Sequence, residues 1–456
     1  MSINMLPDDV LLEIFDFSAD ITKQALEAWQ TLVHVCRRWR SLVYRSPRRL
    51  NLGLVCSNKT PARDTLDVWP PLPLFIQCDE RAESVDDIIA VLERSDRVCY
   101  IDLVGLERSH TEKLSAAMRV SFPELTYLRF SSSDETASVF TDSFLRGSAP
   151  RLEYISLEGI PFPGLPKLLL SSNKLVHLGL DNIPHSGYFP PEAIVTALST
   201  LTRLTTLLLH FKSPQSCPDP AQRRPPPSTR SVLPALTHFW FKGVSEYLEV
   251  VVARIDAPRL NKLDITFFNQ IVFDTPQSIQ FISRMPIAPK SFEVARVTFE
   301  DGAATIRLSS QKSGKGEEIR VRIPCRELDW QVSSMEQVRT SCLPPLPTLE
   351  NLYIYEISRG QQHWQHNIEA ALWLELLRPF TSVKNLYLSE DIVQVIVPAL
   401  QELVGGRATE VLPILQNIFL EGRQSSGLVW VGIQQFVSVR QATGHPIAVS
   451  YGQKVR

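Results

Sequence analysis

The two histidines of the segment HWQH have a spacing that could hold a metal ion. His363 and His366 lie three positions apart, so on a helix both imidazoles would point to the same side. No cysteine accompanies them, and a solvated helix face is the simpler interpretation. We therefore predict no metal site here.

Motifs of common catalytic sites do not occur in the sequence. It contains no GxSxG, no HExxH, no glycine-rich phosphate loop ending in Gly-Lys-Ser or Gly-Lys-Thr, and no CxxC pair. The seven cysteines, an odd number, favour a reduced intracellular compartment. Cys36 lies among regularly spaced apolar residues, which favours packing over reactivity. These features predict a protein that is not an enzyme and needs no cofactor.

The composition is that of a folded, nearly neutral chain, long enough for two or more domains. Its 456 residues are 44% hydrophobic and carry a formal net charge of −2. A nucleic-acid-binding domain would be basic throughout, so we expect no nucleic-acid partner. The N-terminus has acids where a secretory signal is basic, and no stretch approaches the roughly 20 apolar residues of a membrane span. The expected location is the cytoplasm or the nucleus, with no membrane contact.

The segment CRRWRSLVYRSPRR contains six arginines and raises the question of a local basic surface. Apolar residues recur from Leu32 to Val43, before and within this segment, in steps of three and four, and thus define one face of a helix. The arginines take the other face. The pattern extends back to Ala25 and stops before Pro47, which predicts one amphipathic helix of about 20 residues. Upstream, LPDDVLLEIFDF predicts a second, shorter helix.

Together, LPDDVLLEIF and LVHVCRRWRSLV resemble an F-box, a helical module that docks on a Skp-type adaptor and thereby on the cullin scaffold of a ubiquitin ligase. The distance of 20 positions from Phe15 to Val35 exceeds that of a compact F-box, so the module is enlarged. The alternative is that both segments are ordinary core helices of the rest of the chain. The adaptor contacts implied by the resemblance are Leu6, Pro7, Val10, Leu11, Ile14, Phe15, Val35, Cys36 and Trp39.

An L-x-x-L-x-L pattern repeats through most of the remaining chain, as in LEYISL, LVHLGL and VKNLYL. The repeats begin 23 to 34 residues apart, except for one gap of 55. In six of them a proline stands two residues before the first apolar position, where it ends a helix and starts an extended segment. The first positions are Val98, Leu125, Leu152, Leu175, Leu204, Leu236, Leu260, Val294, Leu349, Val383 and Leu415.

This order of strand, helix and proline turn resembles a leucine-rich-repeat solenoid. The resemblance implies an α/β fold in which concave parallel strands and convex helices follow the helical F-box. The usual asparagine is missing from the ninth position, so we expect an irregular form, similar to the large F-box families of fungi. The predicted parts are an enlarged F-box (1–55), a linker with an irregular first repeat (56–97), the solenoid (98–425) with a loop insertion at 212–234 and a hairpin insertion at 303–324, and a capping helix and strand (426–456).

Side chains on the concave face should come from the third, fifth and seventh positions of each repeat, because side chains alternate along a strand. Aromatic residues and charges of both signs occupy these positions, a composition typical of protein-binding surfaces. Coverage of the large rings by a neighbouring loop or the C-terminal segment is the alternative. The predicted target-binding residues are Tyr127, Arg129, Tyr154, His177, His238, Trp240, Lys242, Lys262, Asp264, Arg296, Tyr353, Tyr355 and Tyr387.

The predicted function is that of a substrate-recognition subunit of a Skp/cullin/F-box ubiquitin ligase. The F-box would dock the adaptor, and the solenoid would hold a protein target near the ubiquitin-conjugating enzyme, so that its contribution is proximity. The alternative is a non-catalytic scaffold or binding protein that uses the solenoid without assembling a ligase.

Overall fold

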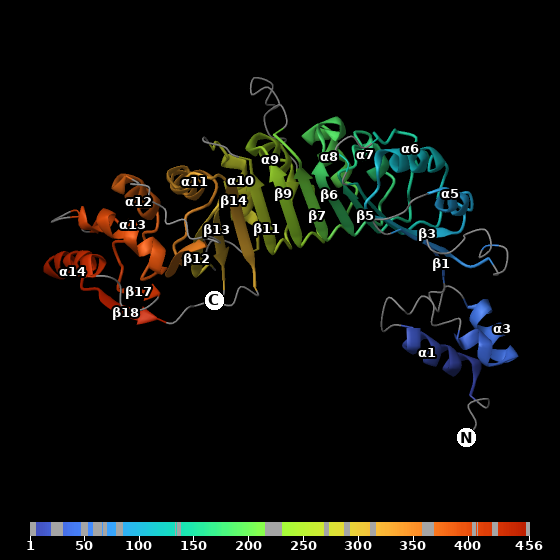
Figure 1. Cartoon of the computed structure of the whole chain (residues 1–456), viewed down its shortest axis with the longest axis horizontal. Helices are drawn as coiled ribbons and strands as arrows, with labels where there is room; N and C mark the ends of the chain where they lie inside the picture. Colours follow the sequence, from blue (N-terminus) through green and yellow to red (C-terminus); the bar gives the residue numbers. More distant parts are fainter. Residues whose placement is uncertain are drawn as a thin grey trace. The chain divides into compact units, whose positions relative to one another are not determined.

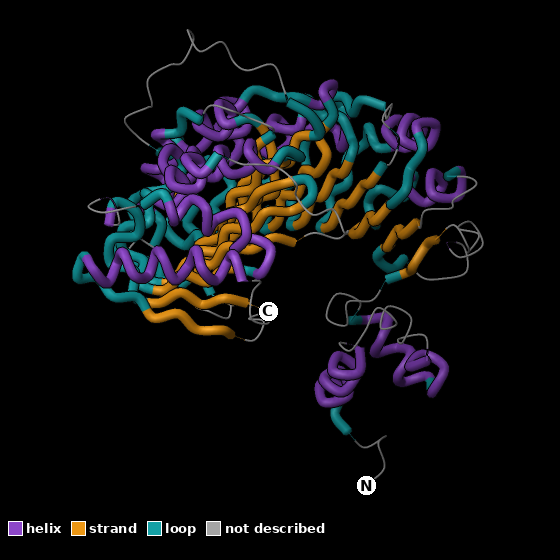
Figure 2. The backbone as a smooth tube through the Cα atoms, turned by 60° about the vertical axis from the view of Figure 1, so that its left-hand side comes forward, coloured by secondary structure: helices purple, strands orange, loops and turns teal. Residues whose placement is uncertain are grey.

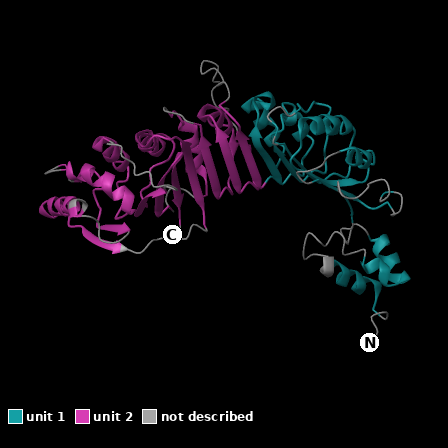
Figure 3. Cartoon of the chain, viewed as in Figure 1, with its two compact units in different colours: residues 1–204 teal, residues 205–456 magenta. Residues whose placement is uncertain are grey.

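The computed structural model describes residues 6–19, 31–46, 53–57, 66, 71–78, 85–132, 134, 138–214, 230–268, 273–286, 292–310, 316–357, 369–403, 407, 409–421 and 427–452. The chain divides into two compact units, Met1–Leu204 and Thr205–Arg456 (Figure 3). In each unit, strands alternate with helices along the chain and lie side by side in a sheet (Figures 1 and 2). The HWQH segment and residues 215–229 of the predicted loop lie outside the described residues.

The first unit begins with a pair of helices, α1 (Asp8–Ala19) and α3 (Arg37–Arg45). Two aspartates in the first turn of α1 complement the positive end of the helix. Phe15 of α1 packs on Trp39 of α3, with ring centroids 4.7 Å apart. This aromatic contact joins the two segments that the sequence resemblance had linked.

The predicted single helix around the arginines is wrong at Cys36. Residues 31–35 are helical, but Cys36 has an extended backbone (φ −158°, ψ 168°), and α3 begins after it. Its sulfur accepts a hydrogen bond from the Trp39 N–H at 3.5 Å, which satisfies one of the unpaired donors at the start of α3. Arg40 donates to the carbonyl of Val33 at 2.9 Å and so spans the break. Periodicity alone does not reveal such an interruption, because the apolar spacing continues through it.

Parallel strands occur at the repeats that the leucine pattern predicts. In the first unit the sheet order follows the chain, and all neighbours pair in parallel. Its strands are β1 (Leu54–Ser57), β2 (Leu74–Cys78), β3 (Val98–Leu103), β4 (Tyr127–Ser131), β5 (Tyr154–Glu158) and β6 (His177–Ile183). The connecting helices are α5 (Asp86–Leu92), α6 (Arg108–Ala117), η2 (Phe144–Gly147), α7 (Leu165–Leu169), η3 (His185–Gly187) and α8 (Pro191–Leu198).

The second unit departs from chain order at one place. The spatial order is β7 (Thr206–Phe211), β9 (His238–Gly243), β11 (Lys262–Phe267), β14 (Glu318–Pro324), β13 (Ala303–Ser309), β12 (Val294–Glu300), β15 (Asn351–Ile357), β16 (Asn385–Leu388), β17 (Asn417–Glu421) and β18 (Ala448–Gly452). Strand β13 runs antiparallel between β12 and β14, and β14 pairs in parallel with β11. The hairpin at 303–324 therefore fills the middle of the sheet rather than projecting from it.

Helices α9 (Ser245–Val252), α10 (Pro276–Arg284), α11 (Leu328–Ser341), α12 (Ala370–Leu377), α13 (Glu390–Gln401) and α14 (Gly427–Ala442) complete the second unit, together with the short pair β8 (Ser231–Val232) and β10 (Ile255–Asp256). None of the helices in the ranges that the structure describes has both the length and the apolar character needed to cross a membrane.

The prolines before the strands occupy a recurring turn. The N–H of the first leucine of a repeat donates to the carbonyl three residues earlier, as from Leu152 to Ala149 (3.2 Å) and from Leu260 to Ala257 (3.1 Å). Proline stands second in both turns, where its fixed φ suits the geometry and no N–H is required. Both leucines are fully buried. The turn thus places the first leucine of the next strand in the core.

Glu249 of α9 caps the following helix of the solenoid. Its buried carboxylate accepts hydrogen bonds from the N–H groups of Gln277 (2.8 Å) and Ser278 (2.7 Å) in the first turn of α10. The hydroxyl of Ser278 donates a third hydrogen bond at 2.6 Å. Burial raises the pKa of Glu249, and these donors oppose that shift because they stabilise the carboxylate.

The substitution Glu249→Ala should destabilise the second unit by about 2 to 3 kcal/mol, because three donors, two of them buried, lose their acceptor. Glu246 lies in the first turn of the same helix in a more exposed position, so Glu246→Ala should cost less than about 0.5 kcal/mol. Midpoints of urea unfolding followed by circular dichroism test this. Equal midpoints for the two variants would contradict the capping role.

Candidate functional site

The helix pair divides the predicted adaptor contacts between its interior and its surface. Leu11, Phe15 and Trp39 are buried, at 0%, 1% and 9% exposure. Val10, Ile14 and Val35 are 38%, 42% and 57% exposed. Pro7 is also exposed, and Leu6 and Cys36 are intermediate. Of the nine predicted contacts, the six that present surface to a partner are therefore Leu6, Pro7, Val10, Ile14, Val35 and Cys36.

Helical spacing explains the division. Val10 and Ile14 lie four residues apart on one face of α1, while Leu11 and Phe15 lie four apart on the face that packs inward. Arg38 of α3 fixes the start of α1, because its guanidinium donates to the Asp8 carboxylate and to the Leu6 carbonyl, both at 2.6 Å. The exposed pair of aliphatic side chains is therefore held in a defined position.

A row of stacked rings crosses the sheet of the first unit. Tyr100, Tyr127, Tyr154 and His177 occupy paired register positions on β3 to β6, with Phe75 of β2 next to Tyr100. The centroid distances from Phe75 to His177 are 5.7, 4.1, 4.2 and 4.2 Å in order. We call these five residues the first ring ladder. Of its members, Tyr127, Tyr154 and His177 were predicted target-binding residues.

The second unit has a shorter ladder of the same kind. Tyr353 stacks on Tyr387 at 4.0 Å, and Tyr387 stacks on Phe419 at 4.5 Å. The guanidinium of Arg296 lies 5.1 Å from the Tyr353 ring on its other side. Tyr353 is consequently only 2% exposed, so its neighbours in the sheet cover it. Within this second ring ladder, Tyr387 and Phe419 retain accessible surface.

An amide ladder accompanies the second ring ladder and was not predicted. The side-chain amide of Asn385 donates to Asn351 at 3.0 Å, and that of Asn417 donates to Asn385 at 2.8 Å. These asparagines occupy the third position of their repeats, whereas the asparagine implied by the leucine-rich-repeat resemblance belongs to the ninth. The recurring triplets Asn-Leu-Tyr, Asn-Leu-Tyr and Asn-Ile-Phe were the signal in the sequence.

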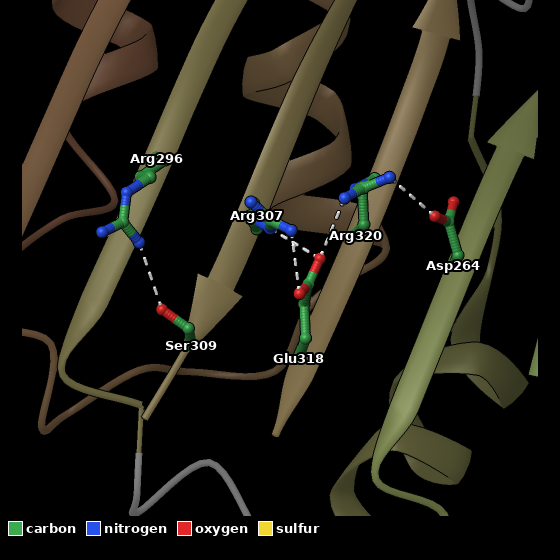
Figure 4. Close-up of polar contacts among 6 residues, drawn as sticks. All are labelled: Asp264, Arg296, Arg307, Ser309, Glu318 and Arg320. Atoms are coloured by element: carbon green, nitrogen blue, oxygen red, sulfur yellow. Dashed lines mark hydrogen bonds and ion pairs between the residues drawn. The ribbon is translucent and has the colours of Figure 1, made fainter. Parts of the chain in front are cut away.

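Charged side chains form a connected network in the middle of the second unit (Figure 4). Glu318 accepts two hydrogen bonds from Arg307, at 2.5 and 3.0 Å, and one from Arg320 at 3.2 Å. Arg320 also donates to Asp264 at 3.1 Å. Arg296 donates to the hydroxyl of Ser309 at 3.3 Å. One carboxylate thus bridges arginines from two neighbouring strands.

The remaining predicted target-binding residues have individual contacts. Arg129 lies 3.9 Å from Asp102, and Trp240 stacks on His238 with centroids 5.3 Å apart. The ammonium of Lys242 lies 6.0 Å from the ring of Phe268. Lys262 is exposed, and Tyr355 lies 5.9 Å from the ring of Tyr353. Arg129 belongs to the first unit, and the other residues of this group belong to the second.

Burial shifts the ring groups further towards their neutral forms. It raises the pKa of Tyr353 to about 12 and also raises that of Tyr127. Desolvation lowers the pKa of His177 and of His238. At neutral pH these four groups are therefore uncharged, and the charge around them comes from arginine, lysine and carboxylate side chains.

A pocket of about 700 Å³ lies where the hairpin leads into α11. Its lining residues are Gly302, Pro324, Cys325, Arg326, Glu327 and Trp330. Burial raises the pKa of the Cys325 thiol, so the thiolate required for nucleophilic chemistry is disfavoured. Within the described ranges, no group of three or more histidine, cysteine, aspartate or glutamate side chains could hold a metal ion.

No protein-family model matches the chain, and neither does any curated protein. Among solved structures, a similar one is the leucine-rich repeat-containing protein LegL7 from Legionella pneumophila, at 10% sequence identity and a TM-score of 0.26. The alignment covers 84% of this chain and 97% of that one. A likeness at this level carries no argument about function, and the repeat architecture rests on the strand pairing described above.

The first ring ladder should contribute to stability through its central member. Replacing Tyr127 by alanine should cost about 2 kcal/mol, because two stacked contacts are lost together with their buried area. Tyr127→Phe keeps the ring and is the matched control, with an expected cost below about 1 kcal/mol. Thermal unfolding of both variants measures the difference. If the two variants unfold at the same temperature, stacking contributes nothing measurable.

Proposed function

We propose that this chain is the substrate-recognition subunit of a Skp/cullin/F-box ubiquitin ligase. In this proposal the helix pair docks a Skp-type adaptor, and the sheet face of the solenoid binds a protein target. The supporting observation is the exposed aliphatic pair Val10 and Ile14 on a helix whose opposite face is closed by Phe15 and Trp39.

The physical case for adaptor binding rests on this exposed apolar surface. Burial of aliphatic side chains is favourable by about 25 cal/mol per Å², so each exposed residue leaves free energy that a partner can use. Val35, beside the break at Cys36, is more exposed than Val10 or Ile14, at 57%. All three are among the adaptor contacts that the F-box resemblance implies.

The case for target binding rests on the open sheet face of each unit. We use the term open face for the strand side chains that are not buried and that alternate along each strand with the buried ones. In β5 and β9 these side chains are half-exposed. Stacked rings beside charged groups can supply both apolar contact area and specific hydrogen bonds. A target held there would gain reactivity by proximity to a conjugating enzyme, with no catalytic group from this chain.

A scaffold or binding protein that assembles no ligase is the second candidate, because the open faces would serve either role. The two are separated by adding a cullin to a preformed complex of this chain and the adaptor. Co-elution of all three, with ubiquitin transfer to captured proteins that depends on this chain, supports the ligase. Adaptor binding without cullin recruitment supports the scaffold.

The double substitution Val10→Ala and Ile14→Ala should weaken binding to a purified Skp-type adaptor at least about tenfold, which corresponds to about 1.4 kcal/mol. Both side chains are exposed, so the fold should survive. The matched control is Val120→Ala with Leu170→Ala, which removes side chains that are 46% and 49% exposed elsewhere in the first unit. Isothermal titration calorimetry measures each affinity. Unchanged adaptor binding by V10A/I14A would contradict the proposal.

A further inference from the structure

We propose that the open face of the second unit binds an acidic segment of a protein partner, whose glutamate or aspartate side chains sit on a row of three arginines. The arginines are Arg296, Arg307 and Arg320, from three neighbouring strands. This inference rests on the proposed function in one respect, because it names the chemistry of the target that the solenoid would recognise.

Strand register brings the three arginines into one row. Arg320 of β14 pairs with Arg307 of β13, and Arg307 pairs with Arg296 of β12. Neighbouring strands lie about 4.8 Å apart, so the three side chains leave the same face within about 10 Å. Figure 4 shows them on one face of the sheet. The antiparallel hairpin is what creates this row, because it inserts β13 and β14 between β11 and β12.

Positive charge is in excess on this part of the open face. The whole chain has a net charge of −2, so the excess is local. Several cations on β9, β11, β14, β13 and β12 share the face with fewer carboxylates. The cations are Lys242, Lys262, Arg296, Arg307, Arg320 and Arg322, and the carboxylates are Asp264, Glu300 and Glu318. An anionic partner complements such a surface.

Glu318 shows how a carboxylate binds here. Its two oxygens accept two parallel hydrogen bonds from Arg307, the bidentate geometry that guanidinium and carboxylate prefer, and one oxygen also accepts from Arg320. The side chains of Arg307 and Arg320 remain 35% and 37% exposed. A carboxylate of a partner would meet their accessible edges and the neighbouring guanidinium of Arg296.

The row continues into aromatic rings, of which Tyr353 is covered while Tyr387 and Phe419 keep accessible surface, and this sets the expected form of the ligand. Beyond Arg296 the same register row holds Tyr353, Tyr387 and Phe419. Five strand spacings from Arg320 to Phe419 amount to about 24 Å, which an extended peptide of about seven residues spans. The favoured ligand therefore has acidic residues at one end and aromatic or aliphatic residues at the other.

The test uses the full chain and two synthetic peptides labelled with fluorescein. One peptide has four glutamates, a glycine and then Phe-Leu-Tyr, and the second has the reverse order. Fluorescence polarisation should show saturable binding of at least one peptide, weakened by added salt because the contact is electrostatic. Replacing the glutamates by lysines should abolish binding.

Two variants make the test specific to the arginine row. Arg296→Gln should weaken peptide binding at least fivefold, whereas Arg378→Gln, which removes an exposed arginine at the end of α12, should change it less than twofold. Glu318→Gln should strengthen binding at least threefold, because the neutral amide releases two guanidinium groups to the ligand. Partial misfolding cannot explain such a gain.

Several outcomes overturn the inference. They are the absence of binding by both peptides, equal effects of R296Q and R378Q, weaker binding by E318Q, and binding only when phosphoserines replace the glutamates. Calorimetric titration of the same variants with the Skp-type adaptor shows whether the acidic-ligand inference fails alone or together with the proposed function, because these variants leave the helix pair intact. Lost peptide binding with retained adaptor binding overturns the acidic-ligand inference alone.

Discussion

Hydrogen bonding between neighbouring strands fixes their spacing at about 4.8 Å, and the surface chemistry of this protein depends on that constraint. Side chains in paired register positions must lie next to one another, whatever their types. Flat groups suit such a spacing, and the stacked rings of the first ladder lie 4.1 to 4.2 Å apart from Tyr100 to His177. The asparagines of the amide ladder meet the same constraint by hydrogen bonding.

Like charges do not suit this spacing, and the arginine row shows how the sheet accommodates them. Neighbouring guanidinium groups repel each other, so the row requires intervening anions or rings. Glu318 bridges Arg307 and Arg320, while Arg296 lies over the ring of Tyr353. Glu318 is thus the internal counter-ion of both arginines, and its side chain is only 13% exposed.

The sequence was sufficient to locate the strands of the leucine repeats, because the leucine spacing and the proline turn are local signals that do not depend on which repeats pair. It was insufficient for the arginine row, because the hairpin changes which strands are neighbours by placing β14 beside β11. The ladders join strands of consecutive repeats, and only the register of those strands shows which rings and amides stack. The burial of Tyr353 follows from its neighbours in the preceding and following repeats, Arg296 and Tyr387.

The helix pair shows a different limit of sequence reasoning. A motif such as LPDDVLLEIF identifies a set of residues, but it does not separate those that pack inside the helix pair from those that stay exposed to a partner. The structure makes this separation by burial, with Phe15 inside and Ile14 outside. Loss of a buried member would act through folding, whereas loss of an exposed member would act through binding. Exposed members such as Val10 and Ile14, each one residue before a buried one, are therefore the positions at which adaptor recognition can be examined independently of stability.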